Sequence, residues 1–76
     1  MKITYDPEGD VLYIRLRDAI SEDSTDVEEG VTADLDGKGH ITALEVLDAS
    51  KRMTEAELAS VHYENLLLIR RAAAKS

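Results

Sequence analysis

Residues 30–50, GVTADLDGKGHITALEVLDAS, decide the fold that the sequence predicts. Apolar and polar residues alternate before the turn, with Val31, Ala33 and Leu35 on one side, and they alternate again over residues 41–47. A period of two is typical of a β-strand with one buried face. The two glycines of DGKG lie between these segments and favour a tight reversal of the chain. The stretch therefore predicts a β-hairpin.

A second hairpin is predicted from residues 1–16, MKITYDPEGDVLYIRL. Ile3 and Tyr5 alternate with polar residues before DPEGD, and the alternation resumes over residues 11–16. Proline at the second turn position presets φ, and glycine at the fourth accepts a positive φ, so a type I turn with a glycine bulge fits. We expect the carboxylates of this turn to project into water.

The segment between the hairpins, AISEDSTDVEEG at residues 19–30, is polar and acidic. It predicts a loop that runs into a ragged edge strand, whose charges discourage pairing with another edge. Four short strands in meander order then fill residues 2–48.

The chain changes character after these strands. TEAE at residues 54–57 is a capping box, in which Thr54 accepts from the Glu57 N–H and Glu57 reaches back, so a short helix is predicted from about residue 55. Residues 61–69 fit either a continued helix or, as we favour, a final strand. Residues 70–76 have no apolar anchor larger than alanine and are expected to fray.

These segments together predict a single domain over residues 1–76. Its fold class is α+β: a small antiparallel β-sheet of four strands in meander order, or five if residues 61–69 are a strand, with one short C-terminal helix. A chain of 76 residues rarely builds a sufficient core alone, and without cysteine neither a disulfide nor a thiolate zinc site can reinforce it. The sequence therefore predicts a homodimer or an obligate partner.

Charge and hydropathy narrow the function classes. The net charge of −7 disfavours direct nucleic-acid binding, which needs clustered Lys and Arg, and suits a basic protein partner attracted by the long-range field. No apolar run approaches the length of a membrane span, and MKITYD has no signal-peptide core, so a cytoplasmic protein without membrane contact is expected.

The acidic stretch at residues 34–45 resembles a calcium loop. Asp34 and Asp36 occupy its first and third positions, and Glu45 occupies the twelfth. The fifth position, which should offer an oxygen, instead carries Lys38, and the flanking pattern is β rather than helical. A divalent-cation-binding domain that uses these three carboxylates and the His40 carbonyl is therefore the alternative hypothesis, and a solvated turn is the preferred interpretation.

A hydrolase is the third and weakest hypothesis. Asp6, Glu8 and Asp10 could supply an acid and a base only in a cleft across a dimer interface, since general acid–base chemistry needs carboxylates in differing environments. His40 and His62 have no second ligand or nucleophile at a useful spacing. We therefore expect no enzyme activity, no catalytic or metal-binding residues and no cofactor.

Two spaced blocks of the sequence are similar to a known family. The pattern M-K-[I/V]-x-Y-D-x-E-x-D-x-L-Y-I matches the first block, and G-[I/V]-x-x-D-x-D-x-x-G-x-I-x-x-[I/L]-E-[I/V]-L-D-A-S matches the second. The matching residues are Tyr5, Asp6, Glu8, Asp10, Leu12, Tyr13 and Ile14, then Gly30, Val31, Asp34, Asp36, Gly39, Ile41, Glu45, Leu47, Asp48, Ala49 and Ser50. Over residues 1–52 the chain thus resembles a family of very small bacterial and archaeal proteins of unknown function.

The resemblance implies a small β-rich domain with a helix near its C-terminus and no assigned catalytic residues. Some members of that family look like the antitoxin half of a toxin–antitoxin pair, which would suit an acidic protein that masks a small basic toxin. The leading hypothesis is accordingly a protein-interaction module without catalytic activity, with an antitoxin role implied by the resemblance.

Overall fold

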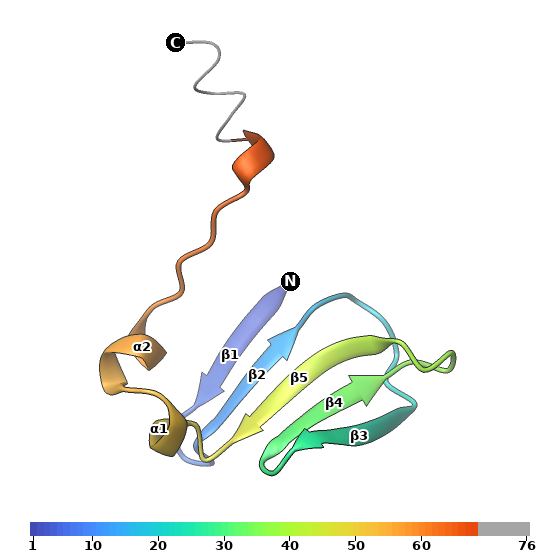
Figure 1. Cartoon of the computed structure of the whole chain (residues 1–76), viewed down its shortest axis with the longest axis horizontal. Helices are drawn as coiled ribbons and strands as arrows, with labels where there is room; N and C mark the ends of the chain where they lie inside the picture. Colours follow the sequence, from blue (N-terminus) through green and yellow to red (C-terminus); the bar gives the residue numbers. More distant parts are fainter. Residues whose placement is uncertain (69–76) are drawn as a thin grey trace.

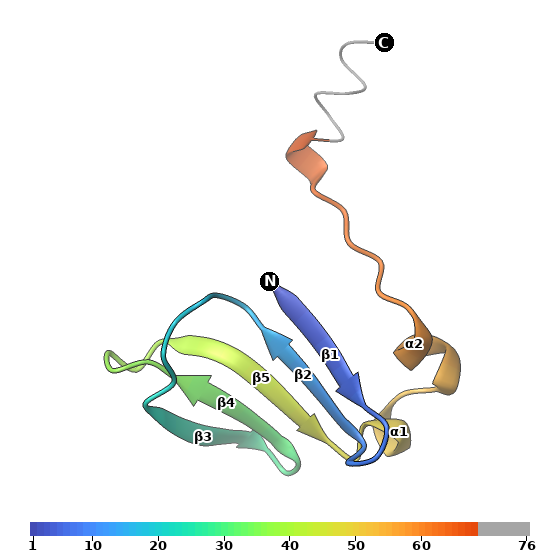
Figure 2. The same cartoon turned by 180° about the vertical axis from the view of Figure 1, so that it is seen from behind.

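The computed structural model of the chain describes residues 1–68, in which a five-stranded antiparallel sheet precedes two short helices (Figures 1 and 2). The strands are β1 (Lys2–Asp6), β2 (Val11–Arg15), β3 (Asp23–Glu28), β4 (Val31–Leu35) and β5 (Ile41–Leu47). The helices are α1 (Ala49–Arg52) and α2 (Glu55–Ala59). The predicted α+β class and both predicted hairpins are confirmed.

The order of the strands differs from the predicted meander. The sheet runs β1-β2-β5-β4-β3, so the β1–β2 hairpin joins a β3–β4–β5 meander through the pairing of β2 with β5. The acidic segment, expected as a ragged edge, forms the fifth strand at the outer edge. Val27 is its only large apolar residue, so β3 cannot fill an inner position, whereas β5 is apolar along most of its length.

The register aligns the apolar side chains of the strands on one side of the sheet. One row runs from Ile3 through Ile14 and Leu44 to Ala33, and the next from Tyr5 through Leu12 and Val46 to Val31. We call these eight residues the apolar face. The opposite side is polar and carries Arg15, Asp34 and Glu45 among its residues, as alternation along paired strands requires.

The buried core is small. Among residues 1–68 the buried apolar side chains are those of Ala33, Ala43 and Ala49, and the largest fully buried side chain is that of Thr42. The Thr42 hydroxyl donates to the Asp34 carbonyl at 3.3 Å. Seven of the eight residues of the apolar face stay partly exposed, because residues 1–68 form no second layer over the sheet.

The C-terminal part contains more helix than predicted. The capping box is confirmed: the Glu57 N–H donates to Thr54 Oγ1 at 3.1 Å, and the Thr54 N–H donates to Glu57 Oε1 at 2.8 Å. The single predicted helix is nevertheless an underestimate, because α1 begins directly after β5.

The strand favoured at residues 61–69 is wrong for the part that the structure describes. Residues 60–65 have no regular structure, and residues 66–68 form one helical turn. The reason is local, since Asn65 Oδ1 accepts from the backbone N–H groups of Leu67 and Leu68, both at 3.1 Å, and so caps that turn. Residue 69 and the fraying predicted for residues 70–76 lie outside the described residues.

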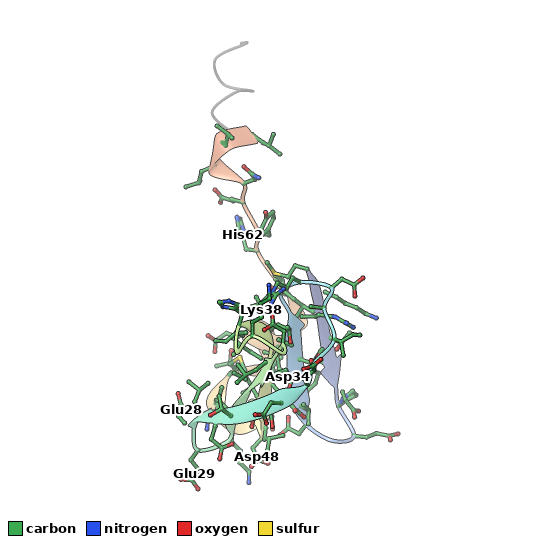
Figure 3. The ribbon with its side chains drawn as sticks, turned by 90° about the vertical axis from the view of Figure 1, so that its right-hand side faces the viewer. Glu28, Glu29, Asp34, Lys38, Asp48 and His62 are labelled. Carbon is green, nitrogen blue, oxygen red and sulfur yellow. The ribbon has the colours of Figure 1, made fainter. Side chains whose placement is uncertain are left out.

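Residues 61–68, which we call the arm, run away from the sheet after α2 (Figures 1 and 3). The radius of gyration is 15.5 Å, whereas a compact chain of this length has about 11 Å. The large apolar side chains of the arm are exposed, namely those of Val61, Tyr63, Leu66, Leu67 and Leu68. Val61 lines an open hollow beside Ile3 and Leu12 and stays 64% exposed, and none of the five side chains is buried in the core of the sheet.

Candidate functional site

The first acidic turn connects β1 to β2. Asp6 Oδ1 accepts the Glu8 N–H at 3.0 Å, as Asp commonly does in turns. The positive φ expected at Gly9 is instead at Asp10, where φ is 55°. A Cβ at Gly9 would lie 3.0 Å from Asp6 Oδ2, so a larger residue there would require a small shift of that carboxylate. The predicted turn is confirmed, but its glycine bulge is wrong because aspartate tolerates the left-handed conformation.

The Asp10 carboxylate does not project into water as predicted. Its Oδ1 accepts the Tyr5 hydroxyl at 2.7 Å and the Ser50 N–H at 2.9 Å, and its Oδ2 accepts the Ser50 hydroxyl at 2.6 Å. The Asp10 carbonyl also accepts the Ala49 N–H at 3.0 Å. The β1–β2 hairpin is thereby attached to the start of α1, forty residues further along the chain.

These hydrogen bonds set the electrostatics of the Asp10 cluster. The Ser50 hydroxyl, followed by the Tyr5 hydroxyl and the Ser50 N–H, lowers the pKa of Asp10, while the bond to Asp10 raises the pKa of Tyr5. A carboxylate of lowered pKa is a poor base for activating the serine hydroxyl that it binds. The arrangement therefore serves as a structural clamp between the β1–β2 hairpin and α1.

The second acidic turn is closed by Asp36. Its Oδ1 accepts the backbone N–H groups of Lys38 at 2.9 Å and His40 at 3.0 Å, and Arg17 forms an ion pair with its Oδ2. The His40 N–H and then the Arg17 guanidinium lower the pKa of Asp36 to about 2. Both oxygens of this carboxylate thus bind the protein itself.

The calcium-loop residues are directed to different tasks. The Tyr13 hydroxyl donates to Asp34 Oδ2 at 3.4 Å on the polar side of the sheet, where Glu45 also lies, while Asp36 closes the turn. In the part of the chain that the structure describes, no three His, Cys, Asp or Glu side chains come close enough to hold a metal ion. The turn predicted between the two strands is present, and Asp36 closes it by bonds to the protein instead of lying free in water.

The two histidines lie apart. His40 is exposed in the β4–β5 turn, and His62 is on the arm, where its Nε2 is 2.5 Å from Glu64 Oε1 (Figure 3). The hydrolase hypothesis gains nothing from them. Asp6 and Glu8 are exposed at the turn tip, and Asp10 is engaged in its clamp.

The most prominent surface feature is the acidic edge, which we define as residues 18–29. It contains six acidic residues and no Lys or Arg: Asp18, Glu22, Asp23, Asp26, Glu28 and Glu29. All six residues of β3 within it are exposed. Among residues 1–68, salt bridges reach Asp18, from Arg15 at 3.2 Å, and Glu28, from Arg52 at 3.1 Å, so four acidic side chains of the edge have no ionic partner in that range.

Arg52 also donates to the Glu29 carbonyl and so fixes α1 to the β3–β4 turn, where Figure 3 places Glu28 and Glu29 near each other. Neither this contact nor the Asp10 clamp was predicted from the sequence. Both contacts link residues more than twenty positions apart in the sequence. No local sequence pattern predicts either of them, apart from the tolerance of Asp for positive φ. The acidic edge, in contrast, follows directly from composition.

Comparison with known proteins places most of this architecture in one family. A family model described as "Protein of unknown function (DUF2283)" matches residues 2–50, from β1 to the serine that Asp10 binds. No curated protein and no solved structure matches the chain. In residues 1–68 no helix has the length and apolar character needed to cross a membrane.

Proposed function

The chain belongs to the DUF2283 family of proteins of unknown function, and we propose its function from the surface that it presents. The protein acts as a small non-enzymatic interaction module that binds a basic protein through the acidic edge. The exposure of every residue of β3, at the outer edge of the sheet, is the observation that supports this proposal.

The position of β3 makes its backbone available. Within residues 1–68 β3 pairs with β4 alone, so one row of its N–H and C=O groups faces outward there. An exposed edge of this kind accepts an extended segment of another chain, which adds a strand to the sheet. Backbone hydrogen bonds supply affinity in such complexes and the side chains supply specificity.

Charge selects the segment that can add to β3. A second copy of the same edge is repelled by like charge, whereas a basic strand or loop would neutralise side chains such as Asp23 and Asp26. The net charge of −7 adds a long-range attraction that accelerates encounter with a basic protein. The acidic edge therefore disfavours self-pairing and favours a cationic partner.

An antitoxin is the more specific form of this proposal. A small basic toxin has the charge that the acidic edge would recognise, and masking its active surface requires binding without catalysis. This form rests on the resemblance described above together with the exposed acid of β3.

The test is co-expression of the full chain with the product of each adjacent gene, followed by measurement of the dissociation constant at low and high salt. The double variant Asp23→Lys/Asp26→Lys should weaken binding at least a hundredfold, and added salt should weaken binding to the wild type. Glu8→Lys/Glu55→Lys, which changes the net charge equally away from β3, is the matched control and should bind within a few-fold of wild type.

Two results would contradict the proposal. Equal weakening by the control pair would remove the acidic edge as the binding surface. Failure of every adjacent product to bind, or of the chain to relieve toxicity of a bound one, would remove the antitoxin form.

A further inference from the structure

We propose that two copies of this chain pack their apolar faces together and that each arm completes the contact on the other copy. The inference is independent of the acidic edge, which lies at the rim of the sheet on β3. It assigns a self-association surface to β1, β2, β5 and β4, and it predicts a ten-stranded sandwich.

The need for a cover comes from the core. In residues 1–68 no side chain larger than that of Thr42 is fully buried, while Leu12, Ile14 and Leu44 stay partly exposed at the centre of the sheet. Apolar burial is the main favourable contribution to folding, and chains of this length bury little of it alone. The apolar face therefore needs a partner that is present whenever the chain folds. A second copy of the same chain always meets this condition.

The α2 helix covers one corner of the apolar face. Leu58 and Met53 line an open hollow of about 380 Å³ together with side chains of β1 and β2. No helix packs over the β4 and β5 part in the described structure, where Leu44, Val46 and Val31 lie. The largest uncovered part thus lies beside the hollow, on the same side of the sheet.

The chemistry of the apolar face favours self-association over a charged partner. None of its eight residues carries a charge at neutral pH, although the whole chain has a net charge of −7. Face-to-face packing therefore keeps the acidic edges of both copies at the rim, in water. The polar side of the sheet cannot form such a contact because it would bury Arg15, Asp34 and Glu45.

The apolar face alone is too small for a stable dimer interface, so the arm is expected to contribute to the contact. The four strands of the apolar face, each of about five residues, cover about 19 by 17 Å, or about 320 Å² in projection, while stable interfaces bury about 800 Å² per partner. Val61 and Tyr63 are 64% and 73% exposed, and three leucines follow them. The arm leaves its own sheet at Ser60, where the backbone is extended, and so can add its side chains to the partner's surface (Figure 1).

The first test is the molar mass of the full chain in solution by light scattering, expected at twice 8.4 kDa. The second uses the absence of cysteine, which lets a single introduced thiol report its own accessibility. Leu44→Cys lies on the apolar face, and Thr32→Cys, equally half-buried on the neighbouring strand, lies on the polar side as its matched control. Maleimide should modify Leu44→Cys at least tenfold more slowly than Thr32→Cys, and dilution to monomer should remove most of the difference.

Each alternative cover gives a different result. A monomer with a protected Leu44→Cys means that the chain covers its own sheet, and a monomer with a reactive one leaves the face to another protein. A dimer in which both thiols react equally means edge-to-edge pairing. Any of the three overturns the proposal, and each is distinct from loss of partner binding at β3.

The contribution of the arm has its own test. A chain that ends after Ser60 should raise the dimer dissociation constant at least tenfold while keeping the strand signal in circular dichroism. An unchanged dissociation constant would show that the sheets associate without the arm. The single variant Asp26→Lys should leave the dimer mass unchanged, because Asp26 pairs with Thr32 on the polar side of the sheet.

Discussion

The hydroxyl of Tyr5 lies 2.7 Å from Oδ1 of Asp10, and the same carboxylate holds Ser50 at the start of α1. One side chain in a turn thus connects the first strand to the chain that follows the last. All three residues lie within residues 2–50, the stretch that the family model matches.

Substitution of Asp10 should lower stability in a graded way. Asp10→Ala removes both carboxylate oxygens and places alanine at a φ of 55°, whereas Asp10→Asn keeps one side-chain oxygen and a residue that tolerates this conformation. The urea midpoint should therefore fall most for Asp10→Ala, less for Asp10→Asn and least for Tyr5→Phe, which removes one donor. Equal midpoints for the first two variants would contradict this account of the clamp.

Acid should weaken the β4–β5 turn through Asp36. Its pKa is about 2 in the folded chain against an ordinary value of 3.8, so its contribution is present above pH 3.8 and is lost as the pH falls towards 2. The lowered pKa values of Asp10 and Glu57 act in the same direction. Asp36→Asn should flatten the pH dependence of the thermal midpoint in this window. Glu8→Gln is the control, since the structure gives its side chain no hydrogen bond in residues 1–68.

Two glycines with the same backbone conformation should differ in their response to alanine. Gly39 has a φ of 82° with open space around it, so Gly39→Ala should cost roughly 1–2 kcal/mol from the left-handed conformation alone. Gly30 has a φ of 81°, and a Cβ there would lie 2.7 Å from Arg52 Nη2, so Gly30→Ala should cost more. Urea unfolding measures both costs.

The additional loss of stability expected for Gly30→Ala, compared with Gly39→Ala, should depend on Arg52. In an Arg52→Ala background the two glycine variants should cost the same, because the side chain that a new Cβ displaces is already absent. A difference that survives in that background would place the cause elsewhere in the β3–β4 turn.

Removal of the capping hydroxyl should act locally. Thr54→Ala should weaken α2 by about 1 kcal/mol. The Leu58 N–H, which donates to the Thr54 carbonyl at 3.0 Å, should then exchange with solvent several-fold faster. The Leu47 N–H, bonded to the Gly30 carbonyl at 2.8 Å, is the internal control and should keep its exchange rate.

The elements that depend on neighbouring residues alone were predicted correctly from local sequence patterns. Alternation along residues 31–47 gave the strands of the second hairpin, and Thr54 with Glu57 gave the start of α2. The position of β5 between β2 and β4 depends on which strand has enough apolar residues to lie at the centre of the sheet. That can be decided only by comparing segments that are far apart in the sequence, so local patterns do not predict it. The arm was assigned wrongly because Asn65, placed among apolar residues, was not recognised as a helix cap.

The surface features divide in the same way. Composition alone indicated the acidic edge, because charge is additive along the chain. The roles of Asp10 and Asp36 required coordinates, since an aspartate in a turn has the same sequence signature whether water or a distant backbone N–H occupies its oxygens.

The strand order separates the sheet into two units that a single segment of main chain connects. Residues 1–15 contain the β1–β2 hairpin, and residues 23–47 contain the β3–β4–β5 meander. The main chain joins these two units through residues 16–22, and the sheet joins them through the pairing of β2 with β5. A protease cut within residues 18–20 would therefore leave two fragments that recognise each other through the β2–β5 ladder and the Asp10–Ser50 contact. Produced separately and mixed, such halves would reassemble, and the chain could serve as a split reporter.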